Sequence, residues 1–242
     1  MPVTPEIQVG SRGFDKRRIL LQHPLFGKLG PDLVDRLSAY AKSKSVKRGA
    51  TIFAKGDPGT SLFAICAGSV KIGVPSLAGR DAIFNVLNAG EIFGEIALLD
   101  GQPRTADAVA ASDCELLVIE RRDFLPVVHN HPEIALKLIE VLCSRLRHSS
   151  EQVEDVMFLD LPGRLAKTLL RLAEQGGRRD RRVPITQREI GQIIGMSRES
   201  TNKQLRNWEQ HNWVRLERGG IVVLAPEALA EVAASAAEQA GD

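Results

Sequence analysis

The stretch FGEIALLDGQPRTADA, residues 93–108, decides how the rest of this sequence is interpreted. It is mostly small and apolar, yet it carries an acid at Glu95 and a base at Arg104, with Gly94 beside the acid. A buried arginine can make a charge-assisted contact to an anion, and backbone N–H groups at the start of a short helical turn can contact the same anion. A carboxylate can accept hydrogen bonds from a sugar hydroxyl. Together these groups describe a site for a ribose bearing a phosphate, and a structural salt bridge is the alternative.

Composition places the chain among ordinary globular proteins. It has 242 residues, 26% of them charged and 43% hydrophobic, which fits one or two soluble domains. No apolar run approaches the roughly 20 residues that cross a bilayer, and residues 1–18 lack the apolar centre of a signal peptide. We therefore expect 1–18 to be a flexible arm and the protein to be cytoplasmic, with no membrane partner.

Cysteine and histidine usage gives no sign of a metal or redox cofactor. Cys66, Cys114 and Cys143 are far apart in the sequence and lie in apolar surroundings, so we expect reduced thiols. The histidines are scattered, and no cysteine or histidine pair has metal-ligand spacing. No nucleophile–base pair or P-loop suggests an enzyme.

The segment before and around the opening stretch is rich in short β-like runs. These alternate with glycine-containing turns, and their spacing predicts an antiparallel sandwich or barrel that ends near Glu120. The expected strands lie at 51–54, 61–66, 69–74, 82–87 and 114–119. Residues 19–44, which precede them, are expected to be helical.

A long helix is expected next, over 132–159. Its apolar positions recur at alternating spacings of three and four, the a/d pattern that two parallel helices bury against each other. A single amphipathic helix packing on its own β-domain is the alternative. Ser149 interrupts the pattern, and a polar residue there can set the register or face a ligand. The expected dimer seam consists of Ile139, Leu142, Leu146, Ser149, Val153 and Val156.

The C-terminal third begins with an expected helix at 164–175. The following GGRRDRRVP, residues 176–184, is expected to form an exposed turn or hairpin. VRLERGGIVVL, residues 214–224, predicts a strand, a Gly-Gly turn and a second strand. The alanine-rich end, 226–242, is expected to be a helix or a frayed tail.

Between these segments lies a helix-turn-helix pattern. Thr186 is a helix N-cap with Glu189 at capping-box spacing. Gly195 ends this first helix and Ser197 caps a second one that runs to about Gln210. The strand pair that follows would be a wing.

The charge of this region points to a polyanion. Residues 160–225 carry 13 Lys and Arg against 7 Asp and Glu, a net charge of +6, whereas the whole chain has +2. Arg198 and Lys203, on the second helix, suit the acceptors of guanine, and Glu199 can accept from cytosine. A carboxylate near phosphates is unfavourable unless it reads a base, so Glu199 favours base reading in the major groove. A surface helix with ion pairs such as Glu199–Lys203 is the alternative.

The two motifs carry a resemblance. FGEIALLDGQPRTADA resembles the phosphate-binding cassette of cyclic-nucleotide-binding domains, and TQREIGQIIGMSRESTNK resembles the winged helix-turn-helix of the cyclic AMP receptor protein/FNR (Crp/Fnr) family. The segments that resemble the family follow one another in the family's order over about residues 20–225. The resemblance implies an α+β fold with a cupin-like β-roll at 19–125, a dimerisation helix at 126–160, a winged helix-turn-helix at 161–225 and a tail at 226–242.

The resemblance also implies roles for individual residues. Glu95 would hold the ribose 2′-hydroxyl, Arg104 the cyclic phosphate, and Ser149 and Ser150 the adenine, one from each subunit. Arg145 would tie the long helix to Glu95, and Thr105 would lie beside the phosphate. The full ligand set is Gly94, Glu95, Ile96, Ala97, Arg104, Thr105, Arg145, Ser149 and Ser150. The DNA-binding set is Thr186, Gln187, Ser197, Arg198, Glu199, Thr201 and Lys203. Thr201 also stands where an apolar residue usually packs inside the motif.

The function that the resemblance implies is a homodimeric transcriptional regulator, controlled by a cyclic nucleotide and not an enzyme. Cyclic AMP is the expected effector, and cyclic GMP is open because a hydroxyl at Thr105 could meet guanine. The expected DNA half-site resembles TGTGA, and RNA polymerase is an expected partner. A regulator with another effector, or one active without ligand, is the first alternative. A cyclic-nucleotide-controlled regulatory subunit is the second.

Overall fold

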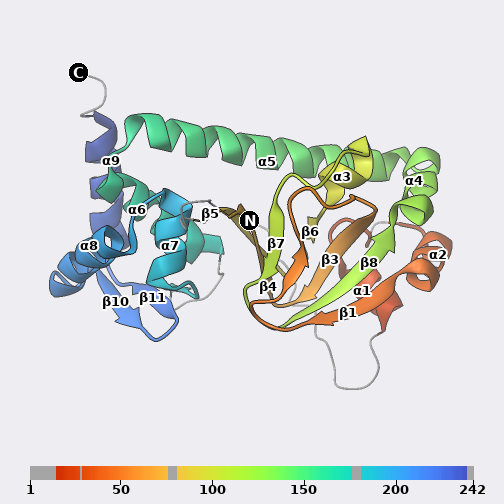
Figure 1. The fold of residues 1–242 in the computed structure, drawn as a ribbon, viewed down its shortest axis with the longest axis horizontal. Helices are drawn as coiled ribbons and strands as arrows, with labels where there is room; N and C mark the ends of the chain where they lie inside the picture. The colour runs from red at the N-terminus through yellow and green to blue at the C-terminus, as the bar shows by residue number, and fades with distance from the viewer. Residues whose placement is uncertain (1–14, 28, 76–80, 176–180, 239–242) are drawn as a thin grey trace. The chain divides into compact units, whose positions relative to one another are not determined.

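The computed structural model describes residues 15–27, 29–75, 81–175 and 181–238. The chain divides into two compact units, one formed by residues 1–79 and 83–144 and the other by 80–82 and 145–242. Helix α5 (Pro132–Phe158) begins in the first unit and ends in the second (Figure 1). Most of the expected arm, residues 1–14, lies outside the described residues.

Two four-stranded sheets form the centre of the first unit. All pairs with a printed register are antiparallel, as the sequence predicts. One sheet has the order β1 (Lys42–Val46), β8 (Cys114–Glu120), β3 (Ser61–Ala67), β6 (Ile92–Phe93). The other has the order β2 (Thr51–Phe53), β7 (Asp107–Ala110), β4 (Ser69–Val74), β5 (Ala82–Asn88).

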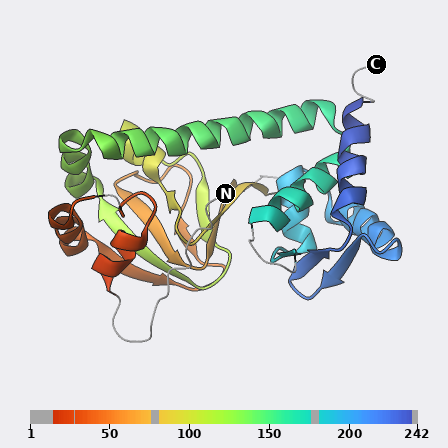
Figure 2. The same cartoon turned by 180° about the vertical axis from the view of Figure 1, so that it is seen from behind.

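The core of this unit has two parts because β3 is buried on both faces. Leu62 and Ala64 belong to a cluster with the helices, whereas Phe63 and Ile65 belong to a cluster with strands of both sheets. The helices around the sheets are α1 (Lys16–Gln22), α2 (Pro31–Tyr40), α3 (Glu95–Asp100) and α4 (Arg121–Asn130), shown in Figures 1 and 2.

Two expectations for this unit are wrong in part. The helical segment expected over 19–44 stops at Tyr40, and residues 42–46 pair with β8 as an exposed, polar edge strand. The polar sequence KSKSV carries no apolar alternation that would predict a strand. The strand forms through backbone pairing, which needs no apolar side chains. The apolar surroundings expected for all three cysteines do not hold for Cys143, which is exposed to solvent. Cys66 is buried, and burial raises the pKa of its thiol to about 12.

The second unit contains the helix-turn-helix. Helix α6 begins three residues earlier than expected, because the Asp160 carboxylate accepts the Gly163 N–H at 2.8 Å and Pro162 is tolerated in a first turn. The other elements are β9 (Arg182–Val183), α7 (Gln187–Ile194), α8 (Arg198–Gln210), β10 (Val214–Glu217), β11 (Gly220–Val223) and α9 (Pro226–Glu238). Residues 176–180 of the expected turn lie outside the described residues.

The alanine-rich end is a helix up to Glu238. Leu229 of α9 is fully buried, and a Cβ on Gly163 of α6 would come within 2.6 Å of the Ala236 Cβ. Helices α9 and α6 therefore pack closely, as Figure 2 shows. No helix within the described ranges is long and apolar enough to span a membrane.

Candidate functional site

The acid and the base of the opening stretch meet at the start of α3. This short helix lies between Gly94 and Gly101, whose φ angles of +79° and +74° are left-handed. A Cβ on Gly94 would lie 2.6 Å from Arg104 Nη1 and 3.1 Å from the Ser61 carbonyl oxygen. Both the backbone angle and the lack of space therefore require glycine at position 94.

Arg104 is buried, with 4% of its surface exposed. Its Nη1 donates to the Gly94 carbonyl and its Nη2 to the Ser61 carbonyl, both at 2.7 Å. The guanidinium carbon lies 4.2 Å from the centroid of the Phe53 ring. A guanidinium has five N–H groups. Nη2 also lies 3.5 Å from the Ser61 hydroxyl, and the buried Nε has no hydrogen-bond partner among the described residues, so donor capacity remains after these contacts.

Burial and two nearby carboxylates act in opposite directions on this arginine. Burial lowers the pKa of the Arg104 guanidinium, while the carboxylates of Glu95 and Asp57 oppose that shift. Glu95 is itself 1% exposed. The site thus holds a cation that suits a phosphate beside a carboxylate that suits a hydroxyl, which fits a phosphorylated sugar better than a simple anion.

Some of the predicted ligand residues come together here and others do not. Gly94, Glu95, Ala97 and Arg104 share this site, with Ala97 buried in α3. Ile96 is 41% exposed and Thr105 is exposed at the end of the same segment.

Three predicted ligand residues belong to the second unit. Arg145 is half-buried, and Ser149 and Ser150 are exposed on α5, with the Ser150 hydroxyl donating to the Leu146 carbonyl at 3.0 Å. Their place beside the nucleotide stays a prediction.

Sequence reasoning missed Phe53 and Ser61. They lie on β2 and β3 and contact Arg104 only because of how the strands fold around the stretch 93–108. No local motif signals such contacts.

The helix-turn-helix forms as predicted. The Thr186 hydroxyl accepts the Glu189 N–H at 3.2 Å and the Glu189 carboxylate accepts the Thr186 N–H at 2.9 Å, a complete capping box. Gly195 ends α7 with φ +72°. A Cβ on Gly191 would come within 2.9 Å of the Thr201 hydroxyl, so α7 and α8 cross closely at this glycine.

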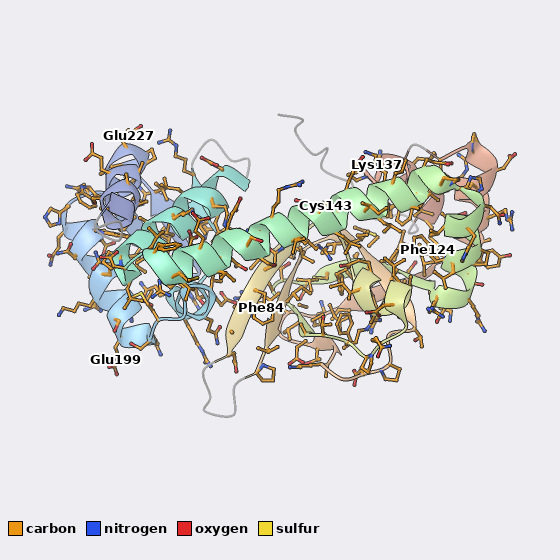
Figure 3. The ribbon with its side chains drawn as sticks, turned by 90° about the horizontal axis from the view of Figure 1, so that it is seen from above. Phe84, Phe124, Lys137, Cys143, Glu199 and Glu227 are labelled. Atoms are coloured by element: carbon orange, nitrogen blue, oxygen red, sulfur yellow. The ribbon has the colours of Figure 1, made fainter. Side chains whose placement is uncertain are left out.

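The first turns of α8 present the predicted base-reading side chains. The Ser197 hydroxyl caps the helix through the Ser200 N–H at 3.1 Å. Arg198, Glu199 and Lys203 are all exposed, and Figure 3 labels Glu199 at the beginning of α8. A helix end with this set of exposed donors and acceptors can reach base edges in a major groove.

Thr201 is not one of these exposed side chains. It is 0% exposed and its hydroxyl donates to the Ser197 carbonyl at 2.9 Å. The structure thus gives the Thr201 side chain a packing role inside the motif, and its place in the DNA-binding set stays a prediction.

The neighbouring elements complete the winged form. Thr186 and Gln187 are half-buried at the start of α7. Strands β10 and β11 pair antiparallel from Val214 opposite Val223 to Glu217 opposite Gly220, with Gly219 left-handed in the turn. The Glu217 carboxylate accepts from Arg182 of β9 at 3.0 Å, which ties the third strand to the wing.

The a/d positions of α5 form an exposed apolar stripe in the single chain. Between 53% and 68% of the surface of Ile139, Leu146, Val153 and Val156 is exposed. Leu142 is half-buried. Such a stripe on a long helix is what a helical partner would bury.

No cluster of His, Cys, Asp or Glu that could hold a metal ion occurs in the parts of the chain that the structure describes.

Comparison with known proteins identifies both units. Residues 43–131 match the family described as "Cyclic nucleotide-binding domain", and residues 163–232 match "Crp-like helix-turn-helix domain". The chain is 34% identical over 217 residues to the "CRP-like cAMP-activated global transcriptional regulator" of Mycobacterium tuberculosis, covering 88% of this chain and 97% of that protein.

A second relative and a solved structure match the chain over most of its length. The chain is 33% identical over 210 residues to the "Cyclic AMP receptor protein" of Thermus thermophilus, with 87% of this chain and 96% of that protein covered. The solved structure of the c-di-GMP responsive global regulator CLP of Xanthomonas campestris matches with a TM-score of 0.71 at 20% identity, over 80% of this chain and 99% of that one, which bears on the fold alone. With both domains matched in this order over most of its length, the chain belongs to the Crp/Fnr family of DNA-binding transcriptional regulators.

Proposed function

We propose that the first unit binds a cyclic nucleotide, with cyclic AMP as the effector and cyclic GMP as the alternative. The observation that carries this proposal is the burial of both Arg104 and Glu95, whose carboxylate acts on the pKa of the Arg104 guanidinium. Burying a cation and a carboxylate is costly even when each lies near the other, and a ligand that carries both a phosphate and a hydroxyl would offset that cost. The printed names of two relatives, a cAMP-activated regulator and a cyclic AMP receptor protein, support cyclic AMP.

In this proposal each side chain has a separate role. Arg104 binds the cyclic phosphate, Glu95 accepts from the ribose 2′-hydroxyl, and Thr105 lies beside the phosphate. Ser149 and Ser150 meet the base, one from each subunit, and Arg145 links α5 to the ribose-binding carboxylate.

The chain is a regulator and not an enzyme, so the bound nucleotide acts as an effector. We propose that it acts on a homodimer joined along the α5 stripe. A nucleotide shifts such a dimer towards its DNA-binding arrangement only if it binds that arrangement more tightly. The dimer would read a palindrome of TGTGA-like half-sites through Arg198, Glu199 and Lys203, since two-fold protein symmetry is matched by two-fold operator symmetry. RNA polymerase is the proposed partner at promoters.

Calorimetric titration with cyclic AMP and cyclic GMP tests the binding site. In Arg104→Ala the phosphate loses its charged partner, and we expect cyclic AMP affinity to fall by about a hundredfold or more. Arg122→Ala, which removes an arginine whose side chain is 80% exposed in the same unit, is the control and should bind as the wild type does. Unchanged affinity in Arg104→Ala would refute the site.

One observation favours a second candidate, a regulator that is active without ligand. Two of the Arg104 N–H groups already donate to the carbonyls of Gly94 and Ser61, so part of the site is satisfied by the protein itself. This candidate requires equal operator affinity with and without nucleotide.

A further inference from the structure

The aromatic ring beneath Arg104 suggests a residue that prepares the phosphate site. We propose that Phe53 is a positioning residue for nucleotide binding: its ring face fixes the plane of the Arg104 guanidinium, so that a cyclic phosphate meets the edge of the guanidinium. This inference rests on the proposed function of the same site. Phe53 itself would make no contact with the phosphate.

The geometry around the guanidinium is that of a cation–π contact. The guanidinium carbon lies 4.2 Å from the Phe53 ring centroid, and 5.7 Å from that of Phe63. An arginine within about 6 Å of a ring centroid is attracted by the negative face of the ring, and the attraction is stronger where water is excluded. Because Arg104 is only 4% exposed, water screens this contact little.

The Phe53 ring is itself held in place. Its centroid lies 5.6 Å from that of Phe63 and 5.8 Å from that of Phe93, and the latter two rings stack at 4.9 Å with an interplanar angle of 14°. Phe53 comes from β2, whereas Phe63 comes from β3 and Phe93 from β6. The cluster thus joins strands of both sheets beneath one guanidinium.

Three contacts then define the orientation of Arg104. The Gly94 and Ser61 carbonyls hold the two Nη atoms at 2.7 Å, and the Phe53 ring covers one face. A long side chain that is ordered in advance loses less conformational entropy when its ligand binds. The face contact also leaves only the guanidinium plane for hydrogen bonds, which is the geometry that favours paired N–H contacts to phosphate oxygens.

A simple packing role for Phe53 makes a different prediction from the electrostatic one. Packing depends on ring size, whereas cation–π attraction depends on the electron density of the ring face. Fluorine substituents withdraw that density while changing the size of the ring little. Fluorination of Phe53 therefore separates the two roles.

The experiment incorporates mono-, di- and trifluorophenylalanine at position 53 and measures the Kd for cyclic AMP by calorimetry on the full chain. We expect Kd to rise stepwise along the series, reaching several-fold to about tenfold. The same series at Phe124, a buried ring that packs against Phe26 in the other core cluster, is the matched control and should leave Kd unchanged. Phe53→Leu should weaken binding and Phe53→Tyr should retain it. A flat series at position 53 would overturn the inference.

The failure of this inference can be told apart from failure of the proposed function. If the wild type binds cyclic AMP and the series is flat, only the role of Phe53 is refuted. If the wild type binds no cyclic nucleotide, the proposed function fails, and a double-mutant cycle in ligand-free protein tests the contact itself. There, Phe53→Leu and Arg104→Met should shift the urea midpoint non-additively. Additive shifts would overturn the inference.

Discussion

Arg104 shows how much of a ligand site depends on residues that carry no charge. Its guanidinium is oriented by two backbone carbonyls and one ring, and it has room because position 94 has no side chain. The charged groups of the site, Glu95 and Arg104, could be predicted because they lie in one short stretch. Phe53 and Ser61 could not, since their contacts arise from strand pairing between distant segments.

Replacement of Gly94 by alanine should weaken nucleotide binding while the fold survives. The new Cβ would sit 2.6 Å from Arg104 Nη1 on a left-handed residue, so either the arginine or the start of α3 must move. We expect at least about a tenfold loss of cyclic AMP affinity and roughly 1–2 kcal/mol of lost stability. Gly101→Ala imposes similar backbone strain with its nearest contact at 3.7 Å, and calorimetry should find its affinity close to that of the wild type. Equal losses in the two variants would show that strain, and not the arginine, is responsible.

His23 gives the first unit a pH-dependent stability. It is 2% exposed, its Nδ1 accepts the Leu25 N–H at 3.1 Å, and burial lowers its pKa from 6.5 to about 4, against the opposing effect of a hydrogen bond with the Glu91 backbone. The unfolded chain therefore binds a proton between pH 6.5 and 4 that the folded chain does not. The stability contributed by the neutral ring is complete above pH 6.5 and is lost as the pH falls towards 4.

The size of this effect can be measured against a variant without the imidazole. At about 1.4 kcal/mol per pH unit, the wild type should lose roughly 3 kcal/mol more than His23→Gln between pH 7 and pH 4. Urea unfolding of the full chain at several pH values, followed by circular dichroism, gives this difference. Parallel losses in the two proteins would mean that His23 is protonated in the folded state.

Among elements, the best-predicted ones have strong start and stop signals. The capping box at Thr186, the left-handed Gly195 and the cap at Ser197 fix α7 and α8 almost to the residue. The sequence predicts helix at the polar edge strand β1, because the strand is formed by pairing with β8, which is distant in the sequence. The burial of Thr201 agrees with the sequence comparison, which places it where an apolar residue usually packs inside the motif.

The recognition helix makes a prediction about specificity. If Glu199 reads a C·G pair as proposed, Glu199→Ala should relax the preference for that pair by about 1–3 kcal/mol, with little change at other positions. Arg206 is an exposed cation later on the same helix, and Arg206→Ala is the comparison. It should weaken binding to all operator sequences alike. Anisotropy with single-base operator variants measures both. A uniform loss in Glu199→Ala would assign Glu199 a structural role.

At the scale of the whole molecule, the exposed apolar stripe on α5 is the proposed dimer seam. Leu146 is 68% exposed, so Leu146→Asp should leave the folded chain intact while placing two like charges in the dimer seam. We expect sedimentation to show that the dimer dissociation constant rises by about a hundredfold or more. Arg147→Asp introduces the same side chain one position away, at another exposed residue, and should remain dimeric. Dimers of equal strength in the two variants would place the interface elsewhere.

The most direct test of the account joins both units in one measurement. A labelled TGTGA–N6–TCACA duplex is titrated with the full chain at fixed salt, without ligand, with cyclic AMP and with cyclic GMP, because phosphate contacts make affinity strongly salt-dependent. The account predicts that cyclic AMP tightens binding by about tenfold or more, and that Arg104→Ala removes the effect. Equal affinity in all three titrations would contradict nucleotide control while leaving the DNA-binding unit in place.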